Sequence, residues 1–219
     1  MSVPQSYAVT GEGNRWENIG AMMNRGIEVA IDGDIIRMND FTWNLSANFS
    51  YNKNKLLELY NGVEEYVNST TGLKYMVGHS VTEYFLNRYA GVNPANGDAL
   101  WYTADGELTT EFREDDKVMT GKTYESPWAG GFGTTFIWKG ISLSAQFSWM
   151  AKRYVMNNDR FFEESNGIYS TYNQSKRLLY NRWKKPGDIT DIPRYDVPAQ
   201  LDDRFLENTS FLRLKNLTV

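Results

Sequence analysis

The chain has 219 residues, of which 41% are hydrophobic, 15% aromatic and 23% charged, and this mix excludes a collagenous or disordered protein and suits strands and turns. The absence of cysteine and the single histidine, His79, exclude a disulfide framework, a cysteine nucleophile and a metal centre of two or three histidines. The net charge of −4 argues against a nucleic-acid partner, and we expect none.

The sequence contains no pattern of a membrane-spanning helix or of a signal peptide. No apolar run approaches the roughly 20 residues of a membrane-spanning helix, which excludes helical membrane proteins only. Barrel strands alternate apolar and polar residues and therefore average out as hydrophilic. Residues 1–9 lack the basic and apolar regions of a signal peptide, so an export signal would lie upstream of this piece.

A long antiparallel hairpin is predicted near the N-terminus. Residues 18–31 and 41–52 both alternate with period two, and residues 32–40 between them carry Asp-Gly turn chemistry. Arg25 breaks the apolar face of the first arm once. In the second arm one face is entirely apolar or aromatic; it holds Phe41, Trp43, Leu45, Ala47, Phe49 and Tyr51.

A second hairpin and a fifth strand follow. Residues 128–138 and 141–149 alternate in the same way and are joined by Lys139-Gly140. Residues 211–219 form the fifth predicted strand. Its leucines change phase along the strand, so we expect a bulge near Lys215-Asn216.

The connections between these strands are very unequal in length. Residues 53–126 and 150–209 are long insertions, which count against a compact domain but are typical of a barrel with short turns on one side and long extracellular loops on the other. Both long loops should leave the same edge of the sheet, because an even number of strand crossings separates them. A β-sandwich, with the apolar face buried under a second sheet, is the alternative.

The two architectures differ in where the strand side chains point. In a barrel one set faces lipid: Trp43, Leu45, Phe49, Leu143, Phe147 and Trp149. The alternating polar set then faces the lumen: Asn44, Ser46, Asn48, Ser144, Gln146 and Ser148. In a sandwich the first set would be buried instead.

Six segments in order resemble the C-terminal barrel region of SusC/RagA-type TonB-linked outer-membrane receptors. Together they cover almost the whole chain, which makes the resemblance specific. The segments are residues 18–31 (NIGAMMNRGIEVAI), 41–59 (FTWNLSANFSYNKNKLLEL), 89–108 (YAGVNPANGDALWYTADGEL), 126–149 (SPWAGGFGTTFIWKGISLSAQFSW), 182–194 (RWKKPGDITDIPR) and 203–219 (DRFLENTSFLRLKNLTV).

The resemblance implies an all-β fold, an antiparallel up-and-down meander that is part of a transmembrane 22-stranded β-barrel with long extracellular loops. Residues 1–219 would be a partial TonB-dependent receptor barrel, with the plug and N-terminal domains absent. Five strands cannot close a barrel, so we expect the chain to be a piece of a longer protein.

The implied function is TonB-dependent import of oligosaccharide or peptide across the outer membrane of Gram-negative bacteria of the Bacteroidota type. The implied partners are membrane lipid, a SusD-like lipoprotein, and the TonB complex through the missing N-terminal region. We expect no enzyme, no catalytic residue, no cofactor and no metal. The alternative function is a secreted, soluble β-sandwich that binds glycans through loop aromatics.

Motifs that suggest other chemistry are weak. His79 lies beside Ser80 and near Glu83, but no nucleophile elbow accompanies them, and a loop histidine is the simpler interpretation. The glycines of residues 130–136 lack a third spaced glycine and lie in a strand pattern. Residues 32–40 open like a calcium loop, but the twelfth position holds a tryptophan.

Two features of the long loops are left as open hypotheses. Asp188 and Asp191 sit in a turn with two prolines, where either a calcium site or a rigid surface turn would fit. Aromatic residues recur among polar ones in both loops, which suits sugars or peptides, or else mutual packing of the loops. We expect three of these loop residues to face lid or cargo: Trp101, Tyr102 and Asp105.

Overall fold

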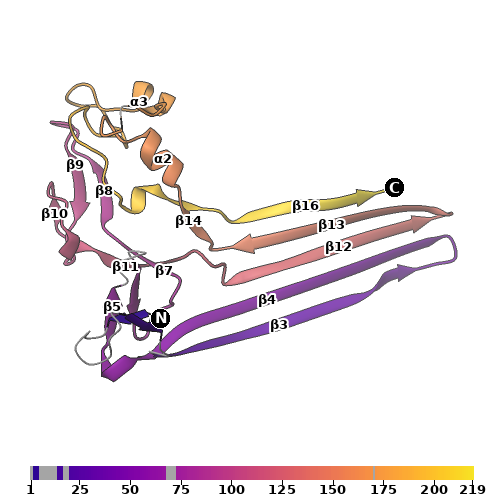
Figure 1. The fold of residues 1–219 in the computed structure, drawn as a ribbon. Coiled ribbons are helices and arrows are strands. Elements are labelled where there is room, and N and C mark those ends of the chain that lie inside the picture. The colour runs from indigo at the N-terminus through magenta and orange to yellow at the C-terminus, as the bar shows by residue number, and fades with distance from the viewer. Residues whose placement is uncertain (1, 5–13, 17–19, 68–72, 170) are drawn as a thin grey trace. The chain divides into compact units, whose positions relative to one another are not determined.

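The computed structural model describes residues 2–4, 14–16, 20–67, 73–169 and 171–219. The chain divides into two compact units, each described by itself (Figure 1). The strand unit comprises Met1–Glu83, Pro127–Trp149 and Leu212–Val219, and the loop unit comprises Tyr84–Ser126 and Met150–Phe211.

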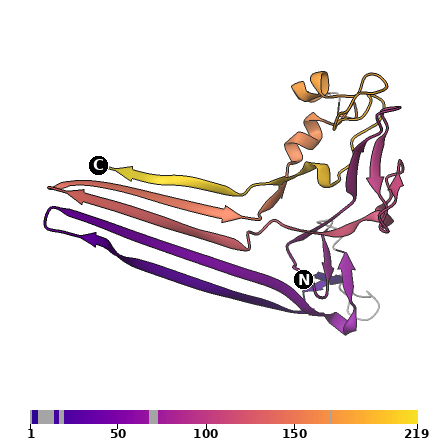
Figure 2. The same ribbon diagram turned by 180° about the vertical axis from the view of Figure 1, so that it is seen from behind.

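A five-stranded sheet of long strands dominates the strand unit, and the arrows of neighbouring strands alternate in direction (Figures 1 and 2). Its spatial order is β16-β13-β12-β4-β3, and neighbouring strands are hydrogen-bonded. The bounds are β3 Gly20–Arg37, β4 Phe41–Leu59, β12 Trp128–Trp138, β13 Ile141–Ala151 and β16 Phe211–Thr218. Both predicted hairpins are therefore confirmed as neighbours in one sheet. Residues 18 and 19 of the first predicted arm lie outside the described residues.

The first hairpin is longer than the sequence pattern predicted. The predicted turn over residues 32–40 is too long. β3 continues to Arg37, which pairs with Thr42, so the turn itself is shorter. A register shift between Asp34 and Ile36 absorbs one extra residue, so the alternation breaks there although the pairing does not. At the other end polar pairs such as Asn24 with Asn54 extend the ladder beyond the apolar stripe.

One face of the sheet is apolar across several strands. The register places Ile27 opposite Tyr51 and Val29 opposite Phe49, and β12 opposes β4 with aromatic pairs on the same face. Ring centroids are 5.7 Å apart for Trp43 and Phe136, 4.7 Å for Phe132 and Phe147, and 6.1 Å for Phe49 and Trp149. The Trp43 indole N–H donates to the Thr134 hydroxyl at 2.9 Å on this face.

The opposite face is polar. The Asn44 amide donates to Asp34 at 3.3 Å, and the hydroxyls of Thr135 and Ser144 lie 3.1 Å apart. None of the six residues predicted to face lipid or a sandwich core is buried within the described chain. Val29 on the apolar face is 50% exposed. The sandwich alternative, which requires these side chains beneath a second sheet, is therefore wrong for this structure.

The long connections leave one edge of the sheet. Neighbouring strands alternate in direction, so both long connections begin and end where the same ends of the strands meet, here called one edge. This edge holds the end of β4, the start of β12, the end of β13 and the start of β16. The short turns at Met38–Asp40 and Lys139-Gly140 lie at the opposite edge. The prediction that both loops leave one edge is confirmed for the sheet. The bulge expected near Lys215-Asn216 stays a prediction.

The strand unit also contains short elements outside the five-stranded sheet. They are β1 Ser2–Pro4, β2 Asn14–Trp16, η1 Tyr60–Gly62, β5 Glu65–Val67 and β6 Lys74–Met76. β7, Glu83–Leu86, begins in this unit and continues into the loop unit, where it is paired with β11, Val118–Thr123.

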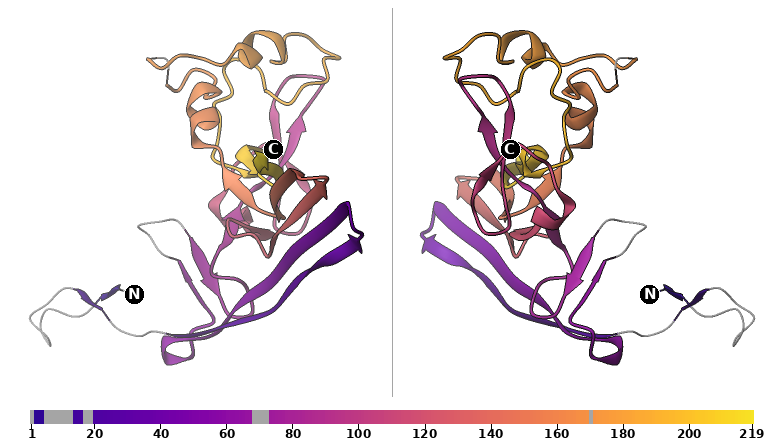
Figure 3. Two further views of the ribbon diagram at one scale, coloured as in Figure 1. Left: turned by 90° about the vertical axis from the view of Figure 1, so that its right-hand side faces the viewer. Right: turned by 90° about the vertical axis from the view of Figure 1, so that its left-hand side faces the viewer.

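The loop unit is built from short elements (Figure 3). Its remaining strands are β8 Arg88–Val92, β9 Ala99–Tyr102, β10 Leu108–Thr109, β14 Tyr154–Met156 and β15 Leu206–Asn208. Its helices are α2 Asn158–Glu163, α3 Lys176–Tyr180, and the 3-10 turns η2 Glu114–Asp116 and η3 Asp203–Phe205. No helix in the described part of the chain has the length and apolarity needed to cross a membrane.

Candidate functional site

The weak motifs of the sequence have structural roles. The His79 ring nitrogen lies 3.0 Å from the Glu83 carboxylate, whereas the Ser80 hydroxyl is bonded to Asn54 and Thr82 instead. No hydrogen bond between His79 and Ser80 exists in the described chain, so the serine is not activated as a nucleophile. Residues 130–136 lie within β12, paired with β4, and do not form a phosphate-binding loop.

The aspartates of the turn at residues 187–194 have partners within the chain. Asp188 accepts from the backbone N–H groups of Lys184 and Lys185 at 3.0 and 3.1 Å, which closes the turn. Asp191 forms an ion pair with Arg177. Among the described residues, no three His, Cys, Asp or Glu side chains are grouped as metal ligands. The turn interpretation accounts for both aspartates.

Asp202 connects the two long loops at the centre of the loop unit. Its side chain is 0% exposed, and its carboxylate accepts from the Trp101 indole N–H at 2.8 Å and from the Arg204 backbone N–H at 3.0 Å. Burial raises the pKa of Asp202 to about 6, against the opposing effect of the nearby Arg204 guanidinium. One buried carboxylate thus joins residues 101 positions apart.

A hydrogen bond between Tyr89 and Asp203 also joins the two long loops, next to the bond between Trp101 and Asp202. The Tyr89 backbone N–H donates to Asp203 at 2.8 Å, and its hydroxyl donates to the Asp191 carbonyl at 3.1 Å. The Arg204 guanidinium carbon lies 4.5 Å from the centre of the Tyr89 ring. Burial raises the pKa of Tyr89 to about 12, so this hydroxyl remains protonated at neutral pH and keeps its proton for the bond.

Trp101 occupies a different environment from the other two residues predicted to face lid or cargo. It is 4% exposed, and its ring meets those of Tyr89 and Phe112 edge-on at 6.1 and 5.6 Å. Tyr102 is 37% exposed, with the Arg88 guanidinium 5.5 Å above its ring. Asp105 is exposed in the turn between β9 and β10. The structure therefore places one of the three residues inside the unit and two on its surface.

A chain of charges joins α2, α3 and the turn at residues 187–194. Buried Glu164 accepts from Arg160 at 3.1 Å and from Arg177 at 3.0 Å. Arg177 reaches on to Asp191, and Arg160 reaches Glu207 at 3.4 Å. Because both cations share the buried carboxylate of Glu164, this network fixes the two short helices, which are too short to be stable alone.

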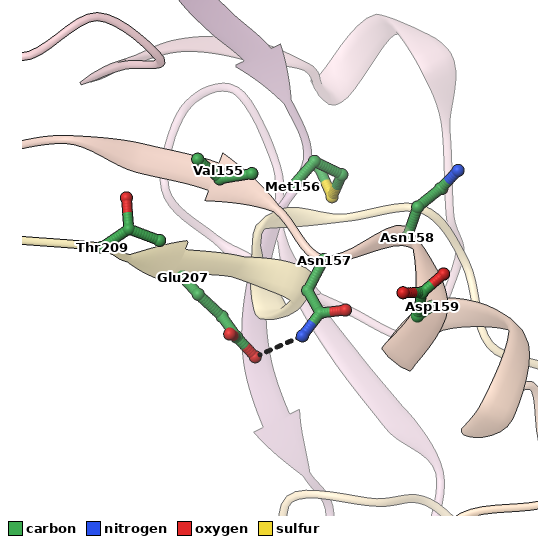
Figure 4. Close-up of a pocket in the computed structure, with 7 residues that line it drawn as sticks. All are labelled: Val155, Met156, Asn157, Asn158, Asp159, Glu207 and Thr209. Atoms are coloured by element: carbon green, nitrogen blue, oxygen red, sulfur yellow. Dashed lines mark hydrogen bonds between the residues drawn. The ribbon is translucent and has the colours of Figure 1, made fainter.

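Two adjoining hollows open beside α2. The first has a volume of about 320 Å³ and lies where β14, α2 and β15 meet (Figure 4). It is lined by Val155, Met156, Asn157, Asn158, Asp159, Glu207 and Thr209, and the Asn157 amide donates to Glu207 at 3.1 Å across one wall. The second, of about 410 Å³, is lined by Asp159, Phe162, Glu163, Tyr172 and Asn173. Both volumes lie in the range of small-molecule sites.

An aromatic cluster supports the second hollow. Phe161 meets Phe205 edge-on at 5.4 Å, and Phe162 contacts Tyr169 at 4.9 Å and Tyr172 at 5.8 Å. The inner rings pack the unit, whereas Tyr172 is 57% exposed at the hollow. The loop aromatics therefore divide into packing residues and a few with an accessible face.

Sequence reasoning missed Asp202, Arg204 and the hollows beside α2. The only sequence signal at the first two is the run Asp202-Asp203-Arg204, in which adjacent acids and a base beside a phenylalanine read as an exposed turn. The hollows depend on residues from three separate segments, and no local pattern identifies them.

Comparison with known proteins shows that the chain is similar to TonB-dependent receptors. No family model matches it. It is 25% identical to the TonB-dependent receptor P39 of Formosa agariphila over 99% of the chain, and 25% identical to the TonB-dependent receptor SusC of Bacteroides thetaiotaomicron over 93%. Among solved structures, the RagAB peptide importer in its 'open-open' state superposes with a TM-score of 0.89 at 34% identity over 99% of the chain.

The chain spans about a quarter of the length of these relatives. It covers 25% of P39, 21% of SusC and 24% of the chain matched in the RagAB importer. A second structure, titled the RagAB peptide transporter, gives a TM-score of 0.87 at 34% identity, again over 24% of the matched chain. The resemblance to SusC/RagA-type TonB-dependent receptors is confirmed over nearly the whole chain.

Proposed function

The chain is similar to SusC/RagA-type TonB-dependent receptors throughout, and from this premise we propose that it forms part of the barrel wall and extracellular loops of an outer-membrane nutrient importer. The observation that carries the proposal is the five-stranded sheet, whose apolar face extends across several strands and has none of its predicted lipid-facing residues buried in the described chain. Exposure of such a face to water would be unfavourable, whereas the lipid of a bilayer would solvate it.

The sheet dimensions support a membrane-spanning role. Crossing a bilayer takes about 9–11 residues in a tilted strand, and β12 and β13 have 11 residues each. β3 and β4, with 18 and 19 residues, would extend past the membrane. The polar face, with Asn44, Asp34 and Ser144, would then line the lumen. The domain organisation proposed here is a partial barrel, with residues 53–126 and 150–209 as extracellular loops.

Among the two cargo classes, the comparison of sequence identities favours peptide over oligosaccharide. The two RagAB structures, titled as a peptide transporter and a peptide importer, are 34% identical to this chain, whereas SusC is 25% identical. The importer would act without covalent chemistry and would draw its energy from TonB through a part of the receptor outside these residues. A SusD-like lipoprotein would close over the extracellular loops.

The loop residues predicted from the sequence take separate roles in this proposal. Tyr102 and Asp105, on the surface of the β9–β10 region, are the ones that would face lid or cargo. Trp101 would act through them, because its buried indole is bonded to Asp202 and holds the strand that carries Tyr102. Double substitution of Tyr102 and Asp105 by alanine should weaken lid binding without unfolding the loop unit.

Transport by the full-length receptor in its own outer membrane tests the proposal. Uptake of a labelled peptide mixture should require the receptor gene and a proton gradient, and a protonophore should abolish it. A labelled oligosaccharide mixture measured in parallel decides between the cargo classes. Uptake that survives either deletion of the gene or loss of the gradient would contradict the proposal.

A further inference from the structure

The two hollows beside α2 share one lining residue. Asp159 lines both of them, and Phe162 and Glu163 follow it at positions three and four residues later, so all three lie on one face of α2. Val155 and Thr209 bound the groove at one end, and Tyr172 bounds it at the other. We call this surface, made of the residues lining the two hollows, the α2 groove.

The charge of the α2 groove has one sign. Its lining contains the carboxylates of Asp159, Glu163 and Glu207 and no lysine or arginine. Glu207 is bonded to Asn157 and paired with Arg160, which lies outside the lining. Within the described part of the chain, the carboxylates of Asp159 and Glu163 make no hydrogen bond or ion pair. Two acceptors are therefore free to bind a ligand.

An accessible ring lies beside these two acceptors. Tyr172 is 57% exposed, and Phe162 packs against it with ring centroids 5.8 Å apart, which fixes its position. Asn173 and Asn158 add amide groups at the rim. An aromatic face beside unpaired carboxylates suits a cation on an apolar stem, which can stack on the ring and pair with the acid.

We propose that the α2 groove binds a lysine or arginine side chain of a peptide, and thereby makes the importer prefer basic peptides. This inference rests on the proposed function, since it assigns a substrate class to the loop unit of an importer. A neutral oligosaccharide would use the ring and the amides but would leave two carboxylates without a charge partner. An acidic peptide would be repelled by the unpaired carboxylates of Asp159 and Glu163.

Binding to the full-length receptor in detergent tests the inference. The probes are a synthetic octapeptide with two lysines, the same peptide with glutamates in their place, and maltohexaose as a neutral oligosaccharide. The lysine peptide should bind at least about tenfold more tightly than its glutamate counterpart, and the difference should shrink at high salt.

Two paired variants distinguish the effect of the carboxylates in the α2 groove from the effect of the net charge of the loop unit. Asp159→Asn with Glu163→Gln should weaken binding of the lysine peptide by about tenfold, as expected from the loss of two exposed ion pairs. Glu125→Gln with Asp115→Asn removes the same charge from exposed positions elsewhere in the loop unit and should change binding less than about twofold. Hydrogen exchange of residues 155–173 should be unchanged in the groove variant.

Four outcomes would overturn the inference. They are equal affinity for the two peptides, equal effects of the two paired variants, tighter binding of maltohexaose than of the lysine peptide, and no binding of any probe. Failure of the inference and failure of the proposed function remain distinguishable. Peptide uptake that depends on the receptor and the proton gradient but ignores peptide charge would refute only the α2 groove.

Discussion

The strand unit and the loop unit differ in how many of their apolar side chains are buried. Of the ten buried hydrophobic residues in the described chain, only Leu56 and Leu59 belong to the strand unit. The long sheet instead leaves Ile27, Val29 and Ile31 at least half exposed. The loop unit has its own core around Phe205 and Ile192, although it consists of connections. In the proposed importer the sheet would therefore depend on lipid, whereas the loop unit is packed around a core of its own.

The largest expected effect is at the centre of the loop core. Phe205 is fully buried, with Phe161 edge-on and the guanidinium groups of Arg160 and Arg204 over its ring. Phe205→Ala should lower the opening free energy of the loop unit by about 3–5 kcal/mol, because it leaves a cavity. Hydrogen exchange of the full-length receptor in detergent measures this loss for the loop-unit amides.

A matched truncation on the sheet sharpens the comparison. Phe136→Ala removes the same atoms from the apolar face, where the ring stacks on Trp43 at 5.7 Å and where, under the proposed function, detergent or lipid would fill the space. The strand-unit amides should lose no more than about 1.5 kcal/mol. Equal losses for the two variants would mean that the sheet also has a sealed core, which contradicts the comparison.

The next effect tests the two faces of β3 at adjacent positions. Val29 opposes Phe49 on the apolar face, and Ala30 opposes Asn48 on the polar face. Val29→Arg should destabilise the receptor by about 2–4 kcal/mol if it lies near the bilayer midplane, whereas Ala30→Arg should cost about 1 kcal/mol or less. Reversible unfolding from lipid vesicles measures both, and a larger cost at Ala30 would reverse the assignment of faces.

Acidity provides a third test, specific to the loop unit. The pKa of Asp202 is raised to about 6 in the folded state, so between about pH 4 and pH 6 the folded state binds more protons than the unfolded state. The opening free energy should therefore fall by up to about 3 kcal/mol as pH rises through this window, from this group alone. Hydrogen exchange near residues 199–206, corrected for intrinsic rates, measures the slope.

The control for this pH dependence is Asp202→Asn. The amide keeps one acceptor but cannot titrate, so the slope in that window should be reduced by the same amount in the variant. Below about pH 4 the variant should also be less stable than the wild type, because the Trp101 and Arg204 donors can no longer both be satisfied. An unchanged slope would show that Asp202 does not titrate in this range.

The smallest effect is expected on the loop surface. Tyr102 is partly exposed, and its described interaction is the Arg88 guanidinium above its ring. Tyr102→Ala should change the opening free energy of the loop unit by about 0.5–1 kcal/mol. Trp101→Ala, next to it, should cost several times more in the same hydrogen-exchange measurement, because it removes a buried ring and orphans an acceptor of Asp202. Similar costs at both positions would contradict the division into packing and surface residues.

Sequence predicted the sheet far better than the loop unit for a physical reason. A strand with one apolar face requires apolar and polar residues to alternate with period two, and each of the five sheet strands shows this alternation over part of its length. The pattern failed where a register shift at Asp34 breaks the alternation while hydrogen bonding continues. It also failed at Lys53 and Lys55, where polar residues continue β4 past the apolar stripe.

The loop unit is held by contacts between residues far apart in the chain. Trp101 meets Asp202, and Arg194 meets Asp98 at 2.9 Å, across about a hundred positions each. Its helices have six and five residues, too short for a 3.6-residue period to be recognised. Trp101 was predicted to face cargo or lid because tryptophan in a polar loop suggests a stacking surface. Only the structure reveals the carboxylate that holds it inside.

Accessibility of successive positions along β3 tests the central claim most directly. This chain contains no cysteine, so single cysteines at positions 27 to 32 can be spin-labelled one at a time in the full-length receptor, with any cysteine elsewhere replaced. In lipid vesicles, labels at Ile27, Val29 and Ile31 should collide mainly with oxygen, which concentrates in the bilayer. Labels at Glu28, Ala30 and Asp32 should collide mainly with a water-soluble nickel reagent. A two-residue alternation with this phase is the predicted result, and uniform accessibility or the opposite phase would contradict a lipid-facing wall.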